Sequence, residues 1–477
     1  MLPLPIDTKR ILGLADDAES AAVATACESR SLLLDRYANP ELKEADRKAF
    51  FASAAKRPCA SIRSSSWLAL LGGGLKAKPE AILFAQLQSR LMLNMASGVM
   101  ENAGVCVDRF GVPYIPGSAV KGCARRMAIQ QLVETREAGK SVQDLTALLV
   151  WIALLYGWGD TDWRAGRKTG KNGRKGEFHS DFEFACGEGE SWLAVRNLAA
   201  ASLLKQLGVK HDSHFKEPWK DLPNFAGSVS FLPAYPVDVA GAELPMRTPT
   251  LGALELDVVT CHHPAYYRGD KPAATDDEDP NPVVFPAVAA GHVFAFAIRP
   301  LRGCSADHLK RARDWLAEGL ATFGLGVKSA AGYGWFDTSP ALGEAVGRHL
   351  RARAEAQRKE HDAQAEKERQ HQAEEARRQA REEVDKATAN MSDEEKLLYT
   401  LRHLQEPQYL SKLDHWKDLT LGERLAIYHL MRSDKSALWL DLRKKATEGK
   451  QKEKARWGQL VQDLFKMAKD RKEKMPS

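Results

Sequence analysis

Apolar positions follow different patterns in successive parts of the chain. Residues 1 to about 75 alternate helix-like apolar patches, such as 30–37 and 46–55, with polar breaks. This pattern predicts a helical N-terminal region that ends near the glycine run at 72–74.

Between about residues 76 and 340, short apolar runs alternate with longer stretches of helical periodicity. The runs typical of strands are 229–232, 254–259 and 293–298. The stretches that predict helices are 118–137, 142–156 and 306–323. Because strands and helices follow in irregular order, we expect an α+β core domain over 76–340 rather than a regularly wound parallel sheet.

After Leu350 the composition changes abruptly. Residues 351–383 contain no Leu, Ile, Val, Phe, Met or aromatic residue, and residues 351–390 hold ten Lys/Arg and ten Asp/Glu. Good helix formers and opposite charges four residues apart predict a solvated single-helix linker over 341–390, with ends ~50 Å apart. Without an apolar seam it is not a coiled coil, and a disordered charged segment is the alternative.

Residues 391–477 return to a core-forming pattern. Ser392 followed by Glu395 predicts a capping box that opens a helix through Leu404. Tryptophans at 416, 439 and 457, with Leu, Ile and Phe partners, indicate a small all-α domain. It holds 19 Lys/Arg against 14 Asp/Glu, so it carries nearly all of the net charge of +6. We therefore expect a basic helical C-terminal domain.

Composition excludes several classes of protein. The longest apolar run, 148–156, is short of the ~20 residues that cross a bilayer, and no secretory signal pattern is visible. Seven cysteines occur without a CxxC pair, which favours reduced thiols over a zinc site or disulfide framework. We expect a cytoplasmic protein without metal or other cofactor, whose mild basicity permits a polyanionic partner.

The segment Gly324–Gly334 has four glycines in eleven residues and contains Lys328 and Ser329. Glycine lets the backbone approach an anion, and the lysine and hydroxyl suit phosphate. Val327 stands before the lysine where a Walker A loop has glycine, and Ser329 stands where a dinucleotide loop has its third glycine. The ATPase and dehydrogenase hypotheses therefore lack their motif. A tight turn before a strand at 333–336 is the structural alternative.

A second motif runs from Pro116 to Gly122, with Ser118 as the expected helix N-cap. Lys121, Arg125 and Arg126 follow in the first helical turns, where a backbone phosphate could bind. A solvated basic helix face is the alternative.

Together, Pro-Gly-Ser-x-x-Lys-Gly and Gly-x-Gly-x-Lys-Ser-x-x-Gly-Tyr-Gly resemble the RAMP proteins of CRISPR effector complexes. Within that superfamily the chain is most similar to the sixth-subunit family of the type III-B Cmr complex. The resemblance covers about 25–340 and includes the further matching segments 101–105, 155–157, 227–236, 257–263 and 266–267.

The resemblance implies a ferredoxin-like, RRM-related core that binds guide RNA through the backbone of the RNA. It implies a non-catalytic, antiviral ribonucleoprotein subunit that closes one end of a filament. The implied partners are guide and target RNA and other Cmr subunits, especially the major backbone RAMP subunit and the first Cmr subunit. We expect phosphate contacts from Lys121, Arg125, Arg126, Lys328 and Ser329. Tyr333 would stack on a base or pack.

A basic, glycine-interspersed segment between Asp162 and Glu177 is a candidate RNA-facing loop or thumb. It contributes Arg164, Arg167, Lys168, Lys171, Arg174 and Lys175 without an acid among them. Binding through these residues would be strongly salt-dependent. A disordered loop that orders on RNA is compatible with the same pattern.

Two other functions remain open. In a neighbouring RAMP subunit type an aspartate before the Pro-Gly-Ser turn cleaves target RNA, and Asp108 occupies the corresponding stretch. A ribonuclease is therefore an alternative, although Pro233 stands where the family often has Asp. A protein–protein adaptor acting through the C-terminal domain is another. His262-His263 would point apart in a strand, so they are not expected to bind metal, and Asp276–Asp279 indicates an acidic loop.

Overall fold

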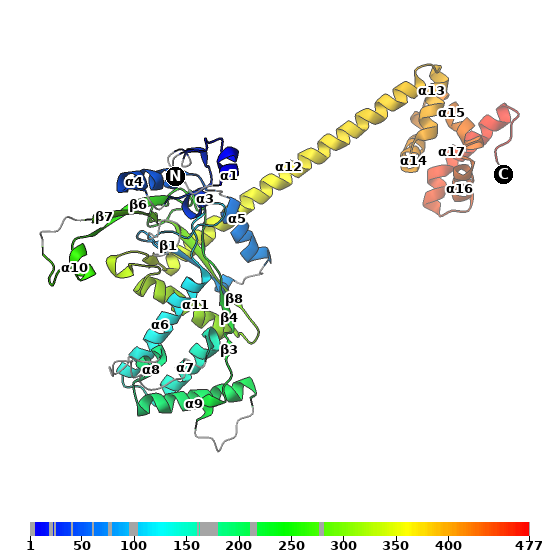
Figure 1. Ribbon diagram of the computed structural model, residues 1–477. Helices are drawn as coiled ribbons and strands as arrows, with labels where there is room; N and C mark the ends of the chain where they lie inside the picture. Colours follow the sequence, from blue (N-terminus) through cyan, green and yellow to red (C-terminus); the bar gives the residue numbers. More distant parts are fainter. Residues whose placement is uncertain are drawn as a thin grey trace. The chain divides into compact units, whose positions relative to one another are not determined.

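The computed structural model describes residues 5–18, 22, 25–39, 42–59, 62–74, 79–94, 104–159, 162, 180–209, 217–275 and 281–476. The chain divides into two compact units, Met1–Ala354 and Glu355–Ser477 (Figure 1). Helices and antiparallel sheets are both present, as expected for an α+β fold. No helix among these residues is long and apolar enough to cross a membrane.

A five-stranded sheet forms the centre of the first unit. Its strands are β1 (Ile82–Leu87), β4 (Val229–Phe231), β5 (Tyr235–Pro236), β8 (Val293–Pro300) and β9 (Phe336–Asp337). The order is β4-β8-β1-β9, β5 also pairs with β8, and every pairing is antiparallel. Since β8 is antiparallel to both β4 and β1, those two strands run parallel with β8 between them.

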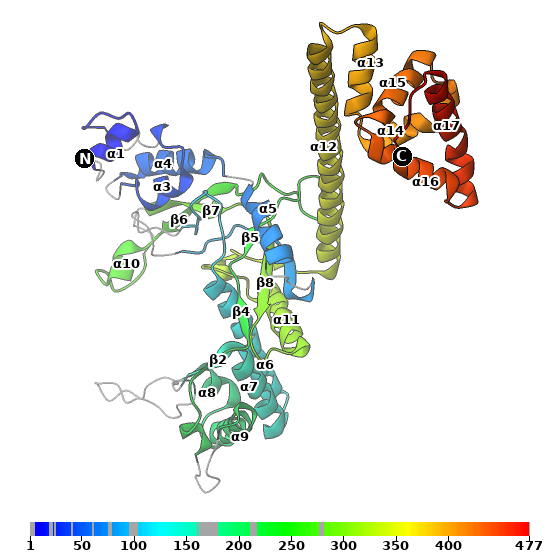
Figure 2. The same ribbon diagram turned by 90° about the vertical axis from the view of Figure 1, so that its right-hand side faces the viewer.

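Two long helices connect these strands. Helix α6 (Gly117–Glu137) lies between β1 and β4 in the sequence, and α11 (Ala306–Thr322) lies between β8 and β9. The two helices pack on each other and on one face of the sheet (Figure 2). The strands that each helix connects are therefore not neighbours in the sheet. Strand β8 lies between β1 and β4, and β1 lies between β8 and β9.

Both faces of β8 are buried. Phe294, Phe296 and Ile298 point into the cluster that α6 and α11 share. Val293, Ala295 and Ala297 point into a second cluster, with Trp67 and Leu71 from the N-terminal region and Leu342 and Val346 from the helix after β9. Large side chains cover one face of β8 and small ones the other. Because both faces are buried, residues 293–298 are all apolar and do not alternate with polar residues.

Further helices and short strands complete this unit. Near α6 lie α7 (Val142–Tyr156), β2 (Gly157–Trp158), α8 (Asp181–Cys186), α9 (Glu190–Leu207), η4 (Pro218–Lys220) and β3 (Phe225–Ala226). A separate hairpin consists of β6 (Leu254–Cys261), α10 (Pro264–Arg268) and β7 (Asn281–Val288). The N-terminal elements are α1 (Ile6–Ile11), α3 (Arg30–Asp35), α4 (Glu44–Lys56), α5 (Ile62–Ala69), η1 (Leu70–Gly74) and η2 (Pro79–Ala81).

Arg30 ties the N-terminal helices to the core. The residue is 4% exposed, and its guanidinium donates to main-chain carbonyls. Ala54, Ala55 and Arg57 accept at the end of α4, where carbonyls lack helical partners. Gly111 accepts at 3.0 Å and Gly252 at 2.6 Å. Burial lowers the pKa of Arg30, and the carbonyl oxygens replace the water that this cation lost.

The charged segment belongs to the single helix α12 (Pro340–Thr388), so the predicted helix, and not the disordered alternative, is what the structure has. The second unit begins within α12, at Glu355. Its other elements are α13 (Asp393–His403), α14 (Glu406–Asp414), η6 (Trp416–Asp418), α15 (Leu421–Arg432), α16 (Ser436–Thr447) and α17 (Gln451–Asp470). Trp416, Trp439 and Trp457 lie in one buried cluster of this unit. The predicted capping box of Ser392 and Glu395 is confirmed at the start of α13.

Two local predictions were wrong. Helix α6 begins one residue before Ser118, and its N-cap is Pro116 without a side-chain cap hydrogen bond. The strand expected at 333–336 begins only at Phe336. In both places the backbone is held against another segment, and those contacts come from residues distant in sequence.

We predict that Phe296→Ala lowers the free energy of unfolding of the first unit by about 3–5 kcal/mol, because it leaves a cavity between buried rings. Phe296 is fully buried, and its ring lies edge-on to Phe336 at 5.7 Å. Hydrogen exchange of the β1 and β8 amides measures the change. Phe184→Ala, at a ring that is 49% exposed, is the control. Equal protection in both variants would contradict the central position of β8.

Candidate nucleic-acid interface

The glycine loop is bound to the backbone of the segment that follows β1. The N–H of Val327 donates to the carbonyl of Met92 at 2.8 Å, and the N–H of Gly334 donates to that of Arg90 at 2.8 Å. Within the loop, the N–H of Leu325 donates to Gly334 at 2.8 Å. These main-chain hydrogen bonds therefore hold the loop in a defined conformation.

Three of its glycines are required by close approach, and the closest contacts are at Gly326 and Gly334. A Cβ at Gly326 would overlap the carbonyl oxygen of Met92, and one at Gly334 would overlap that of Leu325. Both glycines also have positive φ, at 101° and 69°. These two glycines therefore serve the packing of the loop.

Lys328 lies at the tip of this loop in the left-handed region, with φ of 57°. Only one other non-glycine residue among those described, Lys472, has positive φ. The short helix η5 (Ser329–Ala331) follows directly, and the carbonyl of Ser329 accepts from the Trp335 indole at 3.0 Å. Lys328 and Ser329 are therefore held by main-chain conformation and are half-buried.

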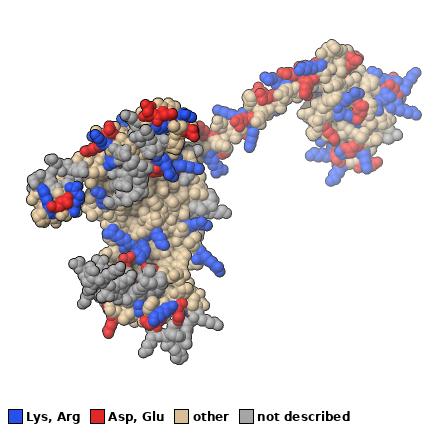
Figure 3. Space-filling view, viewed as in Figure 1, with Lys and Arg blue, Asp and Glu red and all other residues tan. Residues whose placement is uncertain are grey.

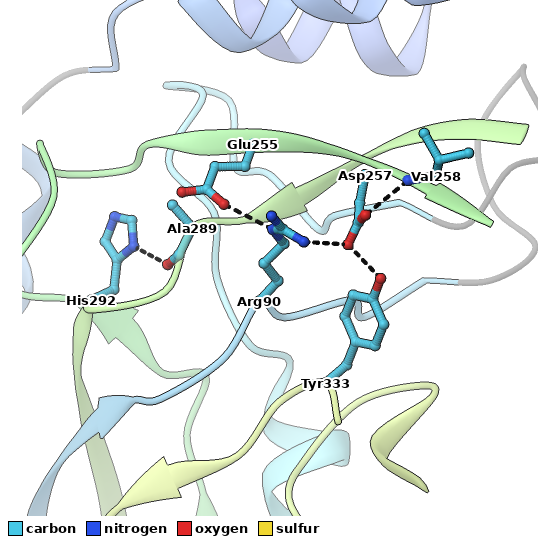
Figure 4. A network of polar contacts seen from close by, with 7 residues as sticks. All are labelled: Arg90, Glu255, Asp257, Val258, Ala289, His292 and Tyr333. Atoms are coloured by element: carbon cyan, nitrogen blue, oxygen red, sulfur yellow. Dashed lines mark hydrogen bonds and ion pairs between the residues drawn. The ribbon is translucent and has the colours of Figure 1, made fainter. Parts of the chain in front are cut away.

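Tyr333 belongs to a polar network between the loop and the β6–β7 hairpin (Figure 4). Its hydroxyl donates to Asp257 at 2.5 Å, and Arg90 pairs with Asp257 at 2.8 Å and Glu255 at 2.9 Å. The Tyr333 ring centre is 6.4 Å from that of Phe285. The two roles expected for Tyr333 were stacking on a base and packing, and in the structure its ring packs near Phe285.

The same network explains two perturbed pKa values. Partial burial and the Asp257 carboxylate raise the pKa of Tyr333 to about 12. Burial alone would raise the pKa of Asp257, but hydrogen bonds from Tyr333, the Val258 N–H and Arg90 lower it. Asp257 is thus a charged acceptor that the loop and Arg90 share.

The second motif begins α6 directly against β4. A Cβ at Gly117 would overlap the carbonyl oxygen of Phe231, so the helix starts in contact with the strand backbone. Lys121, one turn further, donates to the carbonyl of Tyr156 at the end of α7, at 2.7 Å. Partial burial, and then the neighbouring Arg125, lower the pKa of Lys121.

Arg125 and Arg126 have intramolecular partners. Arg125 pairs with Asp181 at 2.6 Å and with Asp162 at 3.7 Å. The guanidinium of Arg126 lies 4.1 Å from the ring centre of Phe323. Lys121 differs from Arg125, because its hydrogen-bond acceptor, the Tyr156 carbonyl, is neutral.

An open cavity of about 560 Å³ lies at the start of α6. Its wall contains side chains of Ser118, Lys121 and Arg125 and the short-strand pair β2–β3. Main chain is accessible along the wall at its glycines, Gly117, Gly157, Gly159 and Gly227. An uncapped helix start with a lysine beside it suits an anion such as a phosphate.

The structure brings the two motifs together through α6 and α11. Cys123 of α6 faces Gly319 of α11, where a Cβ would lie 2.9 Å from the Cys123 carbonyl oxygen. The Cys123 thiol lies 3.6 Å from the carbonyl of Gly324, the first residue of the glycine loop. Figure 3 shows Lys and Arg side chains gathered over the region of α6.

Asp108 has a structural use. Its carboxylate accepts from the N–H of Phe110 at 2.9 Å and of Val112 at 3.1 Å, closing the turn before the second motif. The main-chain carbonyl of Asp108 also accepts from the Ser31 hydroxyl. The turn is therefore sufficient to explain an aspartate at this position.

Other predicted positions lie outside the described residues. They are the basic segment with Arg164, Arg167, Lys168, Lys171, Arg174 and Lys175, the residues Glu101–Ala103, and Asp276–Asp279. No group of three or more metal-ligating side chains occurs in the part of the chain that the structure describes.

Sequence reasoning missed Arg90, Glu255 and the role of Asp257. Arg90 is separated from Glu255 by 165 residues, so spacing carries no signal. The one available sign was the alternation of Glu255 and Asp257 in a predicted strand, which puts both carboxylates on one face.

A family model described as the RAMP superfamily matches residues 69–337, more than half of the chain. A curated relative, the CRISPR system Cmr subunit Cmr6 of Pyrococcus furiosus, is 28% identical over 260 residues. The alignment covers 52% of this chain and 64% of that relative.

Two solved structures are similar to this chain at low sequence identity. A chain of the type III-B Cmr-beta complex bound to cognate target RNA is 17% identical, with 63% of this chain and 77% of that chain covered and a TM-score of 0.34. Cmr6 from Pyrococcus furiosus is 21% identical, with 54% of this chain and 97% of that chain covered and a TM-score of 0.25.

We predict that Tyr333→Phe lowers the free energy of local opening of the glycine loop by about 1 kcal/mol, because one hydrogen bond to a carboxylate is removed while the ring stays packed. Hydrogen exchange of the Gly334 amide measures it. Tyr267→Phe, at a ring that is 75% exposed, is the control. Unchanged exchange in Tyr333→Phe would mean that the network does not hold the loop.

Proposed function

The chain belongs to the RAMP superfamily, and from this we propose that it is a guide-RNA-binding, non-catalytic structural subunit of a type III-B CRISPR effector complex. The observation that carries the proposal is the family match over residues 69–337, which contains both motifs and the whole sheet. The similarity to a Cmr6 protein supports the sixth-subunit position at one end of a backbone filament.

The strand order supports a ferredoxin-like core as part of this proposal. The elements β1, α6, β4, β8, α11 and β9 follow in the order strand, helix, strand, strand, helix, strand. Their sheet order, β4-β8-β1-β9, is that of a split pair of β-α-β units.

In the proposed mode of binding, guide-RNA phosphates contact Lys121 at the start of α6 and Lys328 at the tip of the glycine loop. Both residues come from rigid positions, so little ordering is needed when RNA binds. Ser329, Arg125, Arg126 and the basic segment between Asp162 and Glu177 would add further contacts. Because each contact is to phosphate, binding would be insensitive to base sequence.

We propose no catalytic role for Asp108, because one oxygen of its carboxylate, Oδ1, accepts both hydrogen bonds that close the turn. The partners in the proposal are guide RNA, target RNA and other Cmr subunits, in particular the major backbone subunit and the first subunit. The second unit would have a role in addition to the RNA binding proposed for the first unit.

Replacing Lys121 by Gln and Lys328 by Asn should weaken binding to RNA of any sequence. The slope of log affinity against log salt should fall by about 0.7 for each phosphate that is no longer neutralised. Asn is chosen at 328 because it tolerates positive φ, whereas Ala does not. A salt titration with a scrambled RNA measures both quantities.

The matched control is Lys205→Gln with Lys220→Asn, which removes the same charge from exposed positions in the same unit. An equal weakening in the two double variants would contradict the assignment of Lys121 and Lys328. Absence of RNA binding by the wild-type chain at low salt would overturn the proposed function itself.

Asp108→Asn tests the non-catalytic proposal. Asn keeps an oxygen that can accept from Phe110 and Val112, so the turn should survive while the negative charge is removed. We expect the assembled complex to cleave labelled RNA at the wild-type rate. A decrease of a hundredfold or more, roughly the effect of removing a general acid or base, would make the chain an enzyme.

A further inference from the structure

Charge is divided unevenly within the second unit. Residues 391–434 hold six Lys/Arg and eight Asp/Glu, a net charge of −2. Residues 435–477 hold thirteen Lys/Arg and six Asp/Glu, a net charge of +7. The basic half consists mainly of α16 and α17, two helices that pack on each other. Figure 3 shows Lys and Arg side chains projecting around these helices.

Most acids in the basic half have partners inside the unit. Glu453 accepts from the N–H of Lys450 at the start of α17, and Asp463 accepts from the Trp416 indole. Asp441 pairs with Lys445 on α16. Of these three carboxylates only Asp441 is paired with a cation, and residues 435–477 keep a net charge of +7 with every acid counted.

Most of the cations, in contrast, face water. Among the cations of residues 435–476, ion pairs within 4.0 Å are found only for Lys445 and Arg456. Eleven residues of α17 are exposed, and Asp470, the last residue of the helix, is the one acid among them. The exposed cations of α17 besides Arg456 are Lys452, Lys454, Lys466 and Lys469.

An aromatic ring lies within this basic surface. Phe465 is 43% exposed, and its other side packs edge-on against the buried Trp439 at 5.2 Å. The guanidinium of Arg443, from α16, lies 5.6 Å from the Phe465 ring centre. Leu440 beside them on α16 is 40% exposed. The ring is therefore fixed from behind, open in front, and flanked by a cation.

We propose that the exposed surface of α16 and α17, formed by Arg443, Lys444, Lys454, Phe465, Lys466 and Lys469, is a second RNA-binding site that takes single-stranded RNA. The lysines and Arg443 neutralise phosphates, and an unstacked base lies on Phe465. This site goes beyond the proposed binding of guide RNA by the RAMP core and uses none of its residues.

The chemistry favours single-stranded RNA over other polyanions. A duplex keeps its bases stacked, so it leaves an exposed, cation-flanked ring unused. An acidic protein would engage the lysines but gains little from Phe465. A membrane surface requires a wider apolar face than Leu440 and Phe465 provide.

The test removes charge from α17 alone in the full-length protein. In the triple variant Lys454→Gln, Lys466→Gln and Lys469→Gln, the salt slope for binding a uridine oligonucleotide of about ten residues should fall by about 2. The control triple, Lys386→Gln, Lys396→Gln and Lys417→Gln, makes the same charge change on α12, α13 and η6. It should leave the slope unchanged, and an equal decrease in the two triples would overturn the proposal.

Stoichiometry separates this site from the one in the core. The wild-type chain should bind two short oligonucleotides at low salt, and the α17 triple should bind one. Lys121→Gln with Lys328→Asn should also bind one. If the α17 triple keeps the wild-type number of bound oligonucleotides, the second site does not exist. If the core double keeps two bound oligonucleotides while the α17 triple binds one, the assignment of Lys121 and Lys328 fails and this inference stands.

Phe465→Leu tests the stacking component, because it keeps an apolar side chain against Trp439 but removes the flat ring. We expect affinity to fall about tenfold, with the salt slope unchanged. Polyglutamate is the competitor. If it displaces the RNA at equal charge concentration and Phe465→Leu has no effect, the surface binds acidic protein and the proposal is wrong.

Discussion

Burial of β8 on both faces is the constraint on which the first unit depends. The strand pairs with β1, β4 and β5 through its main chain, and its side chains are shared between two apolar clusters. Helices α6 and α11 cover the face with the large side chains. The residues before β1 and after β9 cover the face with the small ones. A strand in this position can exist only if the segments around it are packed at the same time.

The candidate RNA interface is a consequence of that packing. Since α6 and α11 lie together on one face of the sheet, the segments at their ends also meet. The start of α6 approaches β4, and the glycine loop after α11 lies on the backbone that follows β1. Lys121 and Lys328 are thereby placed by main-chain contacts. The Lys121 side chain donates to the neutral carbonyl of Tyr156, and the position of Lys328 is set by its backbone conformation.

The two units present cations in different ways. In the core, the cations considered for RNA contact emerge from a cavity edge and from a strained loop tip, in a background close to neutral. In the second unit, the cations lie along two helices, and residues 435–477 carry a net charge of +7. The arrangement in the core suits a single phosphate at a fixed position. The arrangement on α16 and α17 suits several phosphates along an RNA backbone. Two such surfaces on one chain fit a protein that contacts RNA at more than one place.

Local sequence determined much of the secondary structure. The capping box of α13, the periodicity of α7 and α11, the charge pattern of α12, and the apolar runs of β4, β6 and β8 all depend on residues close in sequence, so they could be predicted. The two motifs were recognised because glycine, proline and lysine spacing is itself local. The uses of Gly326, Asp108 and Tyr333 could not be predicted in this way.

Only the tertiary structure decided those uses. Gly326 is required by the carbonyl of Met92, Tyr333 is held by Asp257, and Arg30 is buried by carbonyls from three distant segments. The start of α6 at Gly117 follows from its contact with β4, and a preference for Ser as N-cap did not decide it. Each of these depends on the distance between atoms far apart in the chain. Sequence spacing carries no record of such distances, because they arise when the elements pack.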